Sequence, residues 1–285
     1  MFLSLKHVIY MLTPIVVTAL LWLIFHKREK RTQRAVVFSV AMLNTLQHLL
    51  KIYIYPQYFG ESFGGRSTAY NMCAFLILAA PIVLLIGSEL WQNFMFYIGS
   101  IAGFFSLCVT YWLSGPVEEQ IRFVICHGLL FVSSFLPFLF GIYKVNYRKC
   151  WRLPFVFYTI LMILITNNMI TFLLGMVGNT GDMTLFEFLK AQNPCWAMGP
   201  PANYPFVEAL VSPFTPSAFL ASGGGVDTPI LWFAIPLFIL ITTVGFILGI
   251  IIDRKRFSAD IKRFKNRYKK DVYFIGGKPI GKDKK

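Results

Sequence analysis

Long apolar runs separated by short polar segments dominate this chain. Seven runs are long enough to cross a hydrocarbon layer of about 30 Å as α-helices. They are residues 8–25, 35–55, 69–87, 91–113, 121–143, 153–176 and 229–252. Short alternating strands with a turn about every ten residues are absent, which argues against a barrel. The pattern predicts an all-α, polytopic membrane bundle of seven transmembrane helices.

Composition supports this interpretation. The 285 residues are 56% hydrophobic and only 14% charged, with a mean hydropathy of +0.61. That much apolar surface exceeds what a water-soluble core would hold. The first run is expected to be retained rather than cleaved as a signal, because only Lys6 precedes it and no small-residue cleavage pattern follows it.

The net charge of +14 is unevenly distributed along the chain. Of the 27 Lys and Arg residues, five lie between the first two runs, four lie around residues 144–152, and 13 follow residue 252. In a seven-span topology these segments share one face. The positive-inside rule then predicts an N-terminus outside, a cytoplasmic C-terminus and a multi-pass location in the cell membrane. The basic excess is attributed to orientation and lipid attraction, so a nucleic-acid partner is not expected.

Two parts are predicted, a seven-span domain over residues 1–252 and a basic cytoplasmic tail over residues 253–285. Phe257, Ile261, Phe264 and Tyr268 fall on one helical face of the tail amid Lys and Arg. A basic amphipathic helix on the anionic cytoplasmic leaflet fits this pattern, and a solvated tail is the alternative. The 52-residue outer segment 177–228 is interpreted either as a partial lid or as a disordered connection.

The second apolar run carries an unusual stripe of polar side chains. Asn44, His48 and Lys51 share one helical face, with Gln47 beside them. Ionisable groups in a span usually face a bundle interior or a water-filled cavity. Lys51 taken alone favours snorkelling to the headgroups, and His48 taken alone suits a hydrogen-bonded core histidine. The four together favour a lined cavity.

Further polar groups are expected at the same outer depth. Asn71 and Cys73 begin the third run, and His127 lies about two turns into the fifth. The amides of Asn167 and Asn168 fall in the outer half of the sixth run and need partners in lipid. A thiol beside an imidazole or a cation can act as a nucleophile, and amides can stabilise an acyl oxyanion. A membrane cysteine is also often only a small apolar filler.

Neither a metal site nor a cofactor is predicted. The five cysteines lack metal-ligand spacing, and their odd number leaves at least one unpaired. A disulfide that involves Cys195 is left open. No phosphate-cradling glycine loop or dinucleotide fingerprint is present in the sequence.

Four short motifs resemble the YwaF-type integral membrane family. They are Gln47-His48-Leu49-Leu50-Lys51, Tyr70-Asn71-Met72-Cys73, Glu119 followed eight residues later by His127, and Asn167-Asn168-Met169. That family includes bacterial proteins of unassigned role and a mammalian transmembrane acyltransferase that acts on ether phospholipids. The resemblance implies that Cys73 is the acyl-accepting nucleophile and His127 its general base. It implies that Lys51 and Asn71 assist binding or the oxyanion. Gln47 departs from the pattern, since an acidic residue is expected there.

Three functions remain open at this stage. The leading hypothesis is a lipid acyltransferase or lipid-ester hydrolase that uses the Cys73 and His127 pair on membrane lipids. The competing hypothesis is a binding or transport protein for a polar or anionic solute, with its site lined by Asn44, His48, Lys51, Asn167 and Asn168. A non-enzymatic scaffold is the third. The sequence leaves the substrate and the oligomeric state undetermined.

Overall fold

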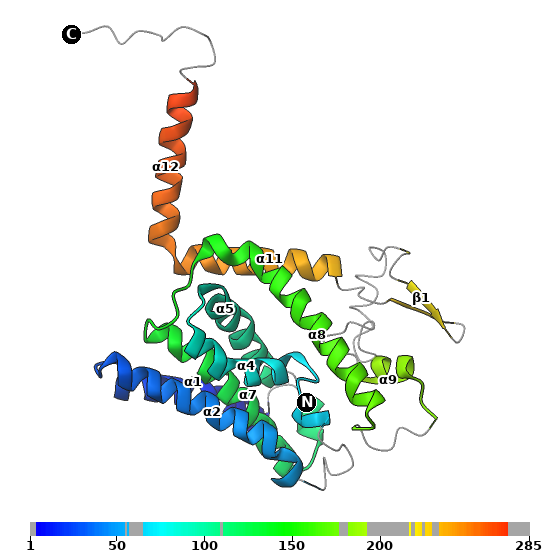
Figure 1. The fold of residues 1–285 in the computed structure, drawn as a ribbon. Helices are drawn as coiled ribbons and strands as arrows, with labels where there is room; N and C mark the ends of the chain where they lie inside the picture. Colours follow the sequence, from blue (N-terminus) through cyan, green and yellow to red (C-terminus); the bar gives the residue numbers. More distant parts are fainter. Residues whose placement is uncertain are drawn as a thin grey trace, which may run out of the picture.

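A computed structural model describes residues 4–54, 56, 65–108, 111–176, 182–192, 217, 220–223, 226–229 and 234–272. Their regular secondary structure is helical, as predicted, apart from a two-stranded antiparallel hairpin of β1 (Leu220–Gly223) and β2 (Val226–Pro229). The hairpin lies beside the helical bundle (Figure 1). Trp196, Tyr204 and Cys195, which belong to the predicted outer segment, lie outside the described residues.

The first two helices form an antiparallel pair. Helix α1 (Leu5–Phe25) begins at Ser4, whose hydroxyl accepts a hydrogen bond from the His7 backbone N–H at 3.2 Å. Helix α2 (Lys30–Ile54) follows after a short turn. The Gln33 amide donates to the Phe25 and His26 carbonyls at 3.0 and 2.9 Å. It therefore satisfies the carbonyls that the end of α1 leaves without helical partners.

Helix α4 (Met72–Ile86) begins and ends with clear capping residues. The Asn71 carbonyl oxygen accepts from the Ala74 backbone N–H at 2.9 Å, which satisfies one donor of the first turn. Gly87 ends the helix with a φ of +71°, in the left-handed region that glycine adopts without steric cost. Pro81 is buried inside the helix and does not end it.

The fourth predicted span forms a helical segment that is not uniformly α-helical. It comprises α5 (Glu89–Phe94), the π-helical turn η3 (Met95–Gly99) and α6 (Ser100–Cys108). The 3-10 turn η4 (Tyr111–Ser114) falls within the last part of the predicted range of residues 91–113. The small residues of this segment have different neighbours, because Gly99 and Gly103 pack against α7 whereas Ser106 lines cavities.

The central helix is α7 (Val117–Leu139), which packs against α1, α2, α4 and α6. It is followed by the 3-10 turn η5 (Tyr147–Arg152), α8 (Leu153–Leu173) and the short α9 (Leu185–Gln192). Helix α9 lies within the predicted outer segment of residues 177–228. Thr184 and Glu187 form a capping box, in which the Glu187 carboxylate accepts from the Thr184 N–H at 2.8 Å and Thr184 Oγ1 accepts from the Glu187 N–H at 3.3 Å.

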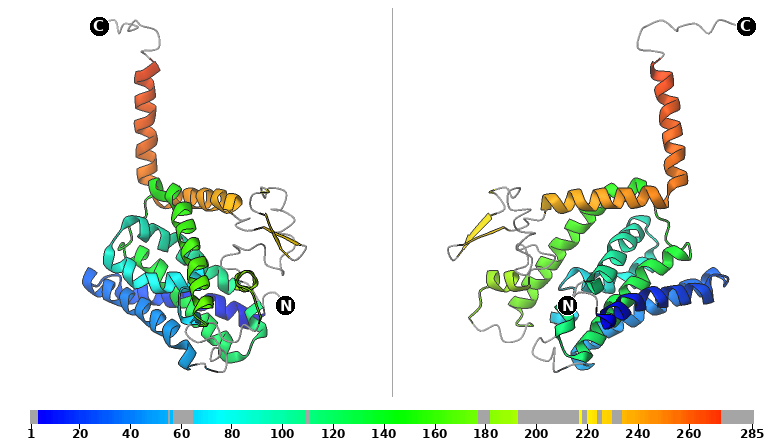
Figure 2. Two further views of the ribbon diagram at one scale, coloured as in Figure 1. Left: turned by 45° about the vertical axis from the view of Figure 1, so that its right-hand side comes forward. Right: turned by 180° about the vertical axis from the view of Figure 1, so that it is seen from behind.

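The last two helices differ in direction. Helix α11 (Ala234–Ile252) packs on η5 and α8, whereas α12 (Arg254–Val272) turns sharply away from the axis of α11 and extends from the bundle (Figure 1, Figure 2). Arg148 and Tyr147 of η5 both donate hydrogen bonds to the Asp260 carboxylate, one of them from Arg148 Nε at 2.7 Å. These bonds tie the start of α12 to the bundle.

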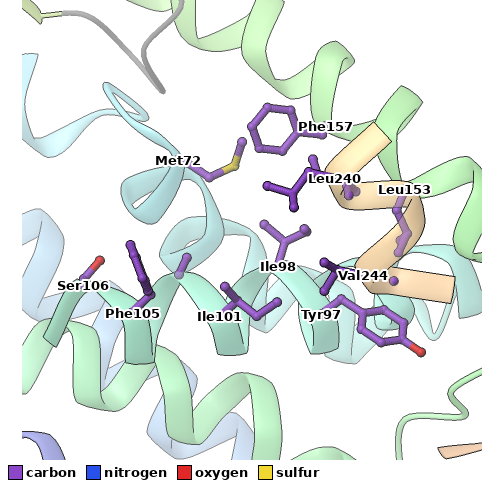
Figure 3. Close-up of a pocket in the computed structure, with 13 residues that line it drawn as sticks. Met72, Tyr97, Ile98, Ile101, Phe105, Ser106, Leu153, Phe157, Leu240 and Val244 are labelled. Atoms are coloured by element: carbon purple, nitrogen blue, oxygen red, sulfur yellow. The ribbon is translucent and has the colours of Figure 1, made fainter. Parts of the chain in front are cut away.

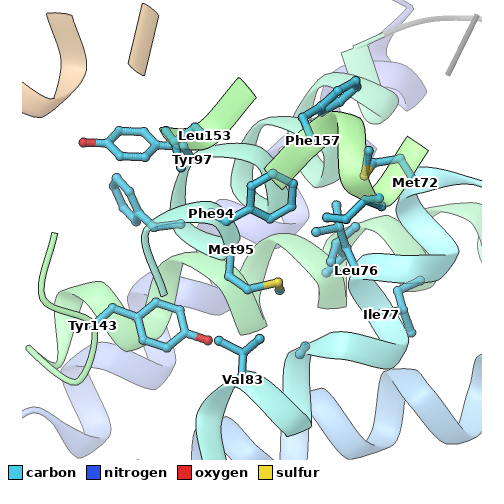
Figure 4. Packing of buried hydrophobic residues seen from close by; sticks show 14 of the residues in the cluster. Met72, Leu76, Ile77, Val83, Phe94, Met95, Tyr97, Tyr143, Leu153 and Phe157 are labelled. Carbon is cyan, nitrogen blue, oxygen red and sulfur yellow. The ribbon is translucent and has the colours of Figure 1, made fainter. Parts of the chain in front are cut away.

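One large apolar cluster joins helices that are far apart in the sequence (Figure 4). Leu76 of α4, Phe94 of α5, Met95 of η3 and Leu153 of α8 are all fully or almost fully buried in it. In lipid, such packing relies on close contact between side chains rather than on exclusion of water. The core therefore fixes the distance between the N-terminal end of α4 and the neighbouring α6.

The segments that connect consecutive helices lie at the two ends of the bundle, as expected when successive helices run in opposite directions. At one end, Lys30 donates to the Phe140 carbonyl and Lys149 forms an ion pair with Glu89 at 2.5 Å. At the other end, the Gly65 N–H donates to the Met176 carbonyl at 3.1 Å and Asn167 donates to Thr68. The Lys- and Arg-rich segments thus share one end.

Within the described parts of the chain, four helical segments are long and apolar enough to cross a membrane, namely Leu5–Phe25, Lys30–Ile54, Val117–Leu139 and Tyr147–Leu173. Two further apolar helices, Met72–Ile86 and Phe238–Ile252, are shorter, and the fourth predicted run is divided at its π turn. The structure thus confirms a helical, multi-pass membrane protein. It shows four of the seven predicted spans at full length, and crossing by the others stays a prediction.

Candidate functional site

A polar cavity of about 590 Å³ lies at the end of the bundle where α2, α4, α6, α7 and α9 meet. Five of the nine predicted site residues line it: Cys73, His127, Lys51, His48 and Asn71. Four do not, namely Asn44, Gln47, Asn167 and Asn168. The expected convergence of the third and fifth runs on one recess is therefore present in the structure.

Cys73 occupies the first turn of α4, directly after the cap at Asn71. The positive end of the helix dipole lies there and favours a negative charge on the sulfur. The Sγ atom lies 3.9 Å from Ser106 Oγ on α6, its hydrogen-bond partner among the described residues. Because Asn71 uses its carbonyl oxygen for the cap, its amide nitrogen remains as the donor on the same cavity wall.

His127 is held in one tautomer by its own helix. Its Nδ1 lies 3.0 Å from the Phe123 carbonyl, and a carbonyl only accepts, so Nδ1 carries a proton. The Phe123 ring packs on the imidazole with a centroid separation of 4.0 Å. In the neutral ring Nε2 keeps its lone pair, which is the form that a general base requires. The His127 ring and the Cys73 thiol are not hydrogen-bonded to each other in this structure. Their hydrogen-bond partners are the Phe123 carbonyl and the Ser106 hydroxyl, respectively.

Lys51 turns into the bundle rather than toward the headgroups. Only 2% of its surface is exposed, so the snorkelling interpretation of this residue is wrong. His48 Nε2 lies 3.1 Å from the Thr68 carbonyl and must donate to it, which leaves Nδ1 to accept from Lys51 Nζ at 3.4 Å. A neutral His48 therefore accepts a hydrogen bond from Lys51.

An aromatic ring organises the cations, which the sequence did not indicate. Lys51 Nζ lies 4.7 Å and Arg66 Cζ 5.4 Å from the centroid of the Tyr70 ring, and His48 stacks on that ring at 6.3 Å. Cations over an aromatic face are stabilised by its quadrupole. Tyr70 was noted only as part of a motif, and its role depends on side-chain positions that spacing along the chain does not reveal.

The third cation of the cavity is Arg122, which forms a bidentate pair with Glu119, including a bond from Nε to Oε2 at 2.6 Å. Among the described lining residues there are therefore three basic side chains, Lys51, Arg66 and Arg122, and one carboxylate, Glu119. Such an excess of positive charge in a partly dehydrated recess favours an anionic group.

The four remaining predicted residues contribute to structure around the cavity. Asn44 donates to the Cys126 carbonyl at 3.0 Å and links α2 to α7. Asn167 donates to Thr68 Oγ1 at 2.9 Å, and Asn168 donates to the Tyr70 carbonyl at 2.8 Å. These two amides therefore hold the segment that carries Thr68 and Tyr70. Gln47 lies beside the stripe, outside the cavity lining.

Helix α9 contributes part of the cavity wall. Ala191 and Gln192 line the cavity, so one described piece of the predicted outer segment does approach the site. The Glu187 pKa is lowered by the Thr184 N–H and then by the Thr184 hydroxyl, which both favour the carboxylate form and keep the cap intact. The rest of the predicted lid is largely outside the described residues.

The described cysteines Cys73, Cys108, Cys126 and Cys150 are free thiols. Over the part of the chain that the structure describes, no group of three His, Cys, Asp or Glu side chains is placed to hold a metal ion. The cavity thus offers a thiol, an imidazole, amide donors and cations to a bound molecule.

Comparison with curated proteins and with solved structures gives no match. A family model does match, and it covers residues 2–244, which include the polar cavity and most of α11. The match does not confirm the YwaF name, which the sequence motifs suggested. The chain belongs to the TMEM164 family and is a multi-pass membrane protein.

Proposed function

We propose that this protein transfers or hydrolyses acyl groups of membrane lipids, with Cys73 as nucleophile and His127 as general base. The observation that carries the proposal is the shared cavity, in which a helix-start thiol and an imidazole with a free Nε2 lone pair line one recess. Nucleophilic catalysis by cysteine requires both a thiolate and a base within reach, and apo geometries are often looser than reacting ones.

The reaction proceeds in two balanced steps. The Cys73 thiol gives its proton to His127 Nε2, and the sulfur attacks the carbonyl carbon of a lipid ester. The ester C–O bond then breaks, and the leaving alkoxide takes the proton from His127 to give a lysolipid and an acyl thioester. In the second step a lysolipid hydroxyl or water attacks the thioester with His127 as base. The C–S bond breaks, and the thiolate recovers the proton.

Two further groups have proposed roles in this chemistry. The Asn71 amide nitrogen is on the cavity wall beside Cys73 and is proposed to donate to the oxyanion of the tetrahedral intermediate. Lys51 and Arg66, both over the Tyr70 ring, are proposed to hold the anionic headgroup of the lipid.

The proposed setting is a seven-span topology with the N-terminus outside and the C-terminus in the cytoplasm. It is supported by the gathering of the basic segments at one end of the bundle and of the polar cavity at the other. Helix α12 leaves the direction of α11, and Phe264 on it is 70% exposed. We propose that this basic helix lies on the anionic cytoplasmic leaflet.

The test is turnover of a diacyl phospholipid by the purified protein in proteoliposomes. Cys73→Ala should lower the rate by about 10³-fold or more, as loss of a nucleophile does in related chemistry. Cys108→Ala is the matched control, because Cys108 is a half-buried thiol on the neighbouring α6 that does not line the cavity. Wild-type turnover by Cys73→Ala would refute the proposal.

A second candidate function rests on the cations. Three cations against one carboxylate also suit a binding or transport protein for an anionic solute. In that case Lys51→Met should abolish binding of the anion, and Cys73→Ala should leave it unchanged. Uptake into proteoliposomes with these two variants separates the candidates, since the acyl-transfer proposal requires the thiol.

A further inference from the structure

A second cavity, of about 340 Å³, lies on the other side of the α4 N-terminus (Figure 3). Its walls come from α4, η3, α6, α8 and α11, and they are almost wholly apolar. Figure 3 shows Ile98, Ile101, Phe157, Leu240 and Val244 around this space. Its described lining residues include no cation and no carboxylate, so it is unsuited to the ligand of the polar cavity.

The two cavities meet at the candidate nucleophile. Ser106 lines both of them. On α4, Met72 lines the apolar cavity and the next residue, Cys73, lines the polar one. Because Cys73 Sγ lies 3.9 Å from Ser106 Oγ, the thiol stands at the boundary between an apolar and a cationic compartment.

A single class of molecule fits this pair of compartments. An acyl lipid has an apolar chain, an ester and an anionic headgroup in that order. With its chain in the apolar cavity and its headgroup among the cations, its ester carbonyl falls at the boundary beside Cys73. A polar solute would leave the apolar cavity unused, and a hydrocarbon without a headgroup would leave the cations unused.

We propose that the apolar cavity binds the acyl chain that is transferred and that its depth sets chain-length selectivity. This inference rests on the proposed acyl-transfer function. Lipid tails are as apolar as the cavity wall, so transfer from the bilayer provides little driving force. Selectivity must therefore come from the shape of the cavity. Ala102 on α6 is a small lining residue whose enlargement would shorten the cavity.

The first measurement does not depend on turnover. The full-length protein in nanodiscs is photolabelled with a phosphatidylcholine that carries a diazirine at the end of one long acyl chain. Label should map to residues 97–105 and 240–245, and Ala102→Phe should reduce it severalfold. Ala19→Phe is the matched control, because Ala19 lies on the exposed face of α1 away from both cavities. Equal labelling of Ala102→Phe and Ala19→Phe would overturn the inference.

The second measurement compares acyl donors. Hydrophobic pockets discriminate chains that differ by one or a few methylenes by roughly 10-fold to 200-fold. Ala102→Phe should therefore lower kcat/KM for a long-chain donor at least about 10-fold and leave a two-carbon acetyl donor unchanged. An equal loss for both donors would also overturn the inference.

Different results would overturn the acyl-transfer function and the binding of the chain in the apolar cavity. If the wild-type protein forms a Cys73 thioester with neither the long-chain donor nor the acetyl donor, the acyl-transfer function is wrong, whatever the photolabelling shows. If the thioester forms but long-chain label falls outside the apolar cavity, the function stands and the chain-binding inference is wrong. Circular dichroism and gel filtration of Ala102→Phe establish that the variant is folded before either comparison is made.

Discussion

The contact between α6 and α7 at Gly103 gives the sharpest structural prediction. A Cβ atom on Gly103 would lie 2.7 Å from the Phe131 backbone nitrogen and 2.9 Å from the His127 carbonyl oxygen. Ordinary van der Waals contact begins at about 3.4 Å, so the two helices would have to separate by at least about 0.7 Å. The obstructing atoms belong to the backbone and have no rotamer to adopt.

We therefore expect Gly103→Ala to lower the free energy of unfolding by about 1–3 kcal/mol, the usual cost of overpacking. The measurement is equilibrium unfolding by SDS in mixed micelles, followed by helical circular dichroism. Because the His127 carbonyl is one of the obstructing groups, the same variant should also lose turnover if His127 is the base.

Gly128→Ala is the matched control on α7 itself. A Cβ atom there would meet Pro14 Cβ at 3.6 Å, which is ordinary contact, and alanine favours a helix over glycine by about 0.8–1.0 kcal/mol. Gly128→Ala should therefore be neutral or stabilising. If Gly103→Ala unfolds at the wild-type SDS fraction, or if both variants are destabilised equally, the close approach of α6 and α7 is not what the structure indicates.

Three further predictions address charge and capping. The Asp260 pKa is lowered to about 2 by hydrogen bonds from Arg148 and then Tyr147. The bond of α12 to the bundle should therefore be complete above about pH 4 and lost as pH falls through about 2, as energy transfer between labels on α11 and α12 would report. Asp260→Asn should remove this pH dependence, and Glu29→Gln, at an exposed position, should keep it. Thr184→Ala removes the cap of α9, worth about 1 kcal/mol, and should speed Cys73 alkylation, whereas Thr166→Ala should not. Lys51→Met should weaken binding of an anionic lipid by about 10-fold or more, as loss of a charged hydrogen bond does, and an unchanged affinity in vesicle titration would refute the role of the cations.

The helical architecture could be predicted because the apolar runs are long and their polar interruptions short. Each of the seven predicted runs overlaps a described helical segment or a broken series of them, although the seventh run begins at a residue of β2. The π turn at Met95–Gly99 could not be predicted, since it depends on packing at both ends of one apolar run. The residues of the β1–β2 hairpin were read only as part of a glycine-rich outer segment.

The candidate site could be predicted where side chains from different helices lie at the same depth in the membrane. Depth brought Cys73 and His127 to one cavity, and the helical face of α2 brought His48 and Lys51 to it. Depth could not separate lining residues from supporting ones. Asn168 was expected in the site because amides in lipid need partners, and it finds one in the Tyr70 carbonyl behind the wall.

The part that Ser106 plays could not be predicted from the sequence. It lies in the fourth apolar run and lines both cavities. A single polar residue in an apolar run is ambiguous until its neighbours from other helices are known.

The π turn at Met95–Gly99 has a consequence for how this chain tolerates changes in length. A π turn holds one residue more than an α turn, so it absorbs an inserted residue while the helix on either side keeps its facing. Asn93 lies before the turn and is hydrogen-bonded to the backbone of Lys144 and Asn146, whereas Gly103 lies after it and packs against α7. The turn therefore lets each residue face its own partner independently of the other. Deletion of one residue within this turn would convert it to ordinary α-helix and would leave the facing of Asn93 and Gly103 unchanged. Deletion of one residue within α6 would instead rotate every later side chain of that helix by about 100°.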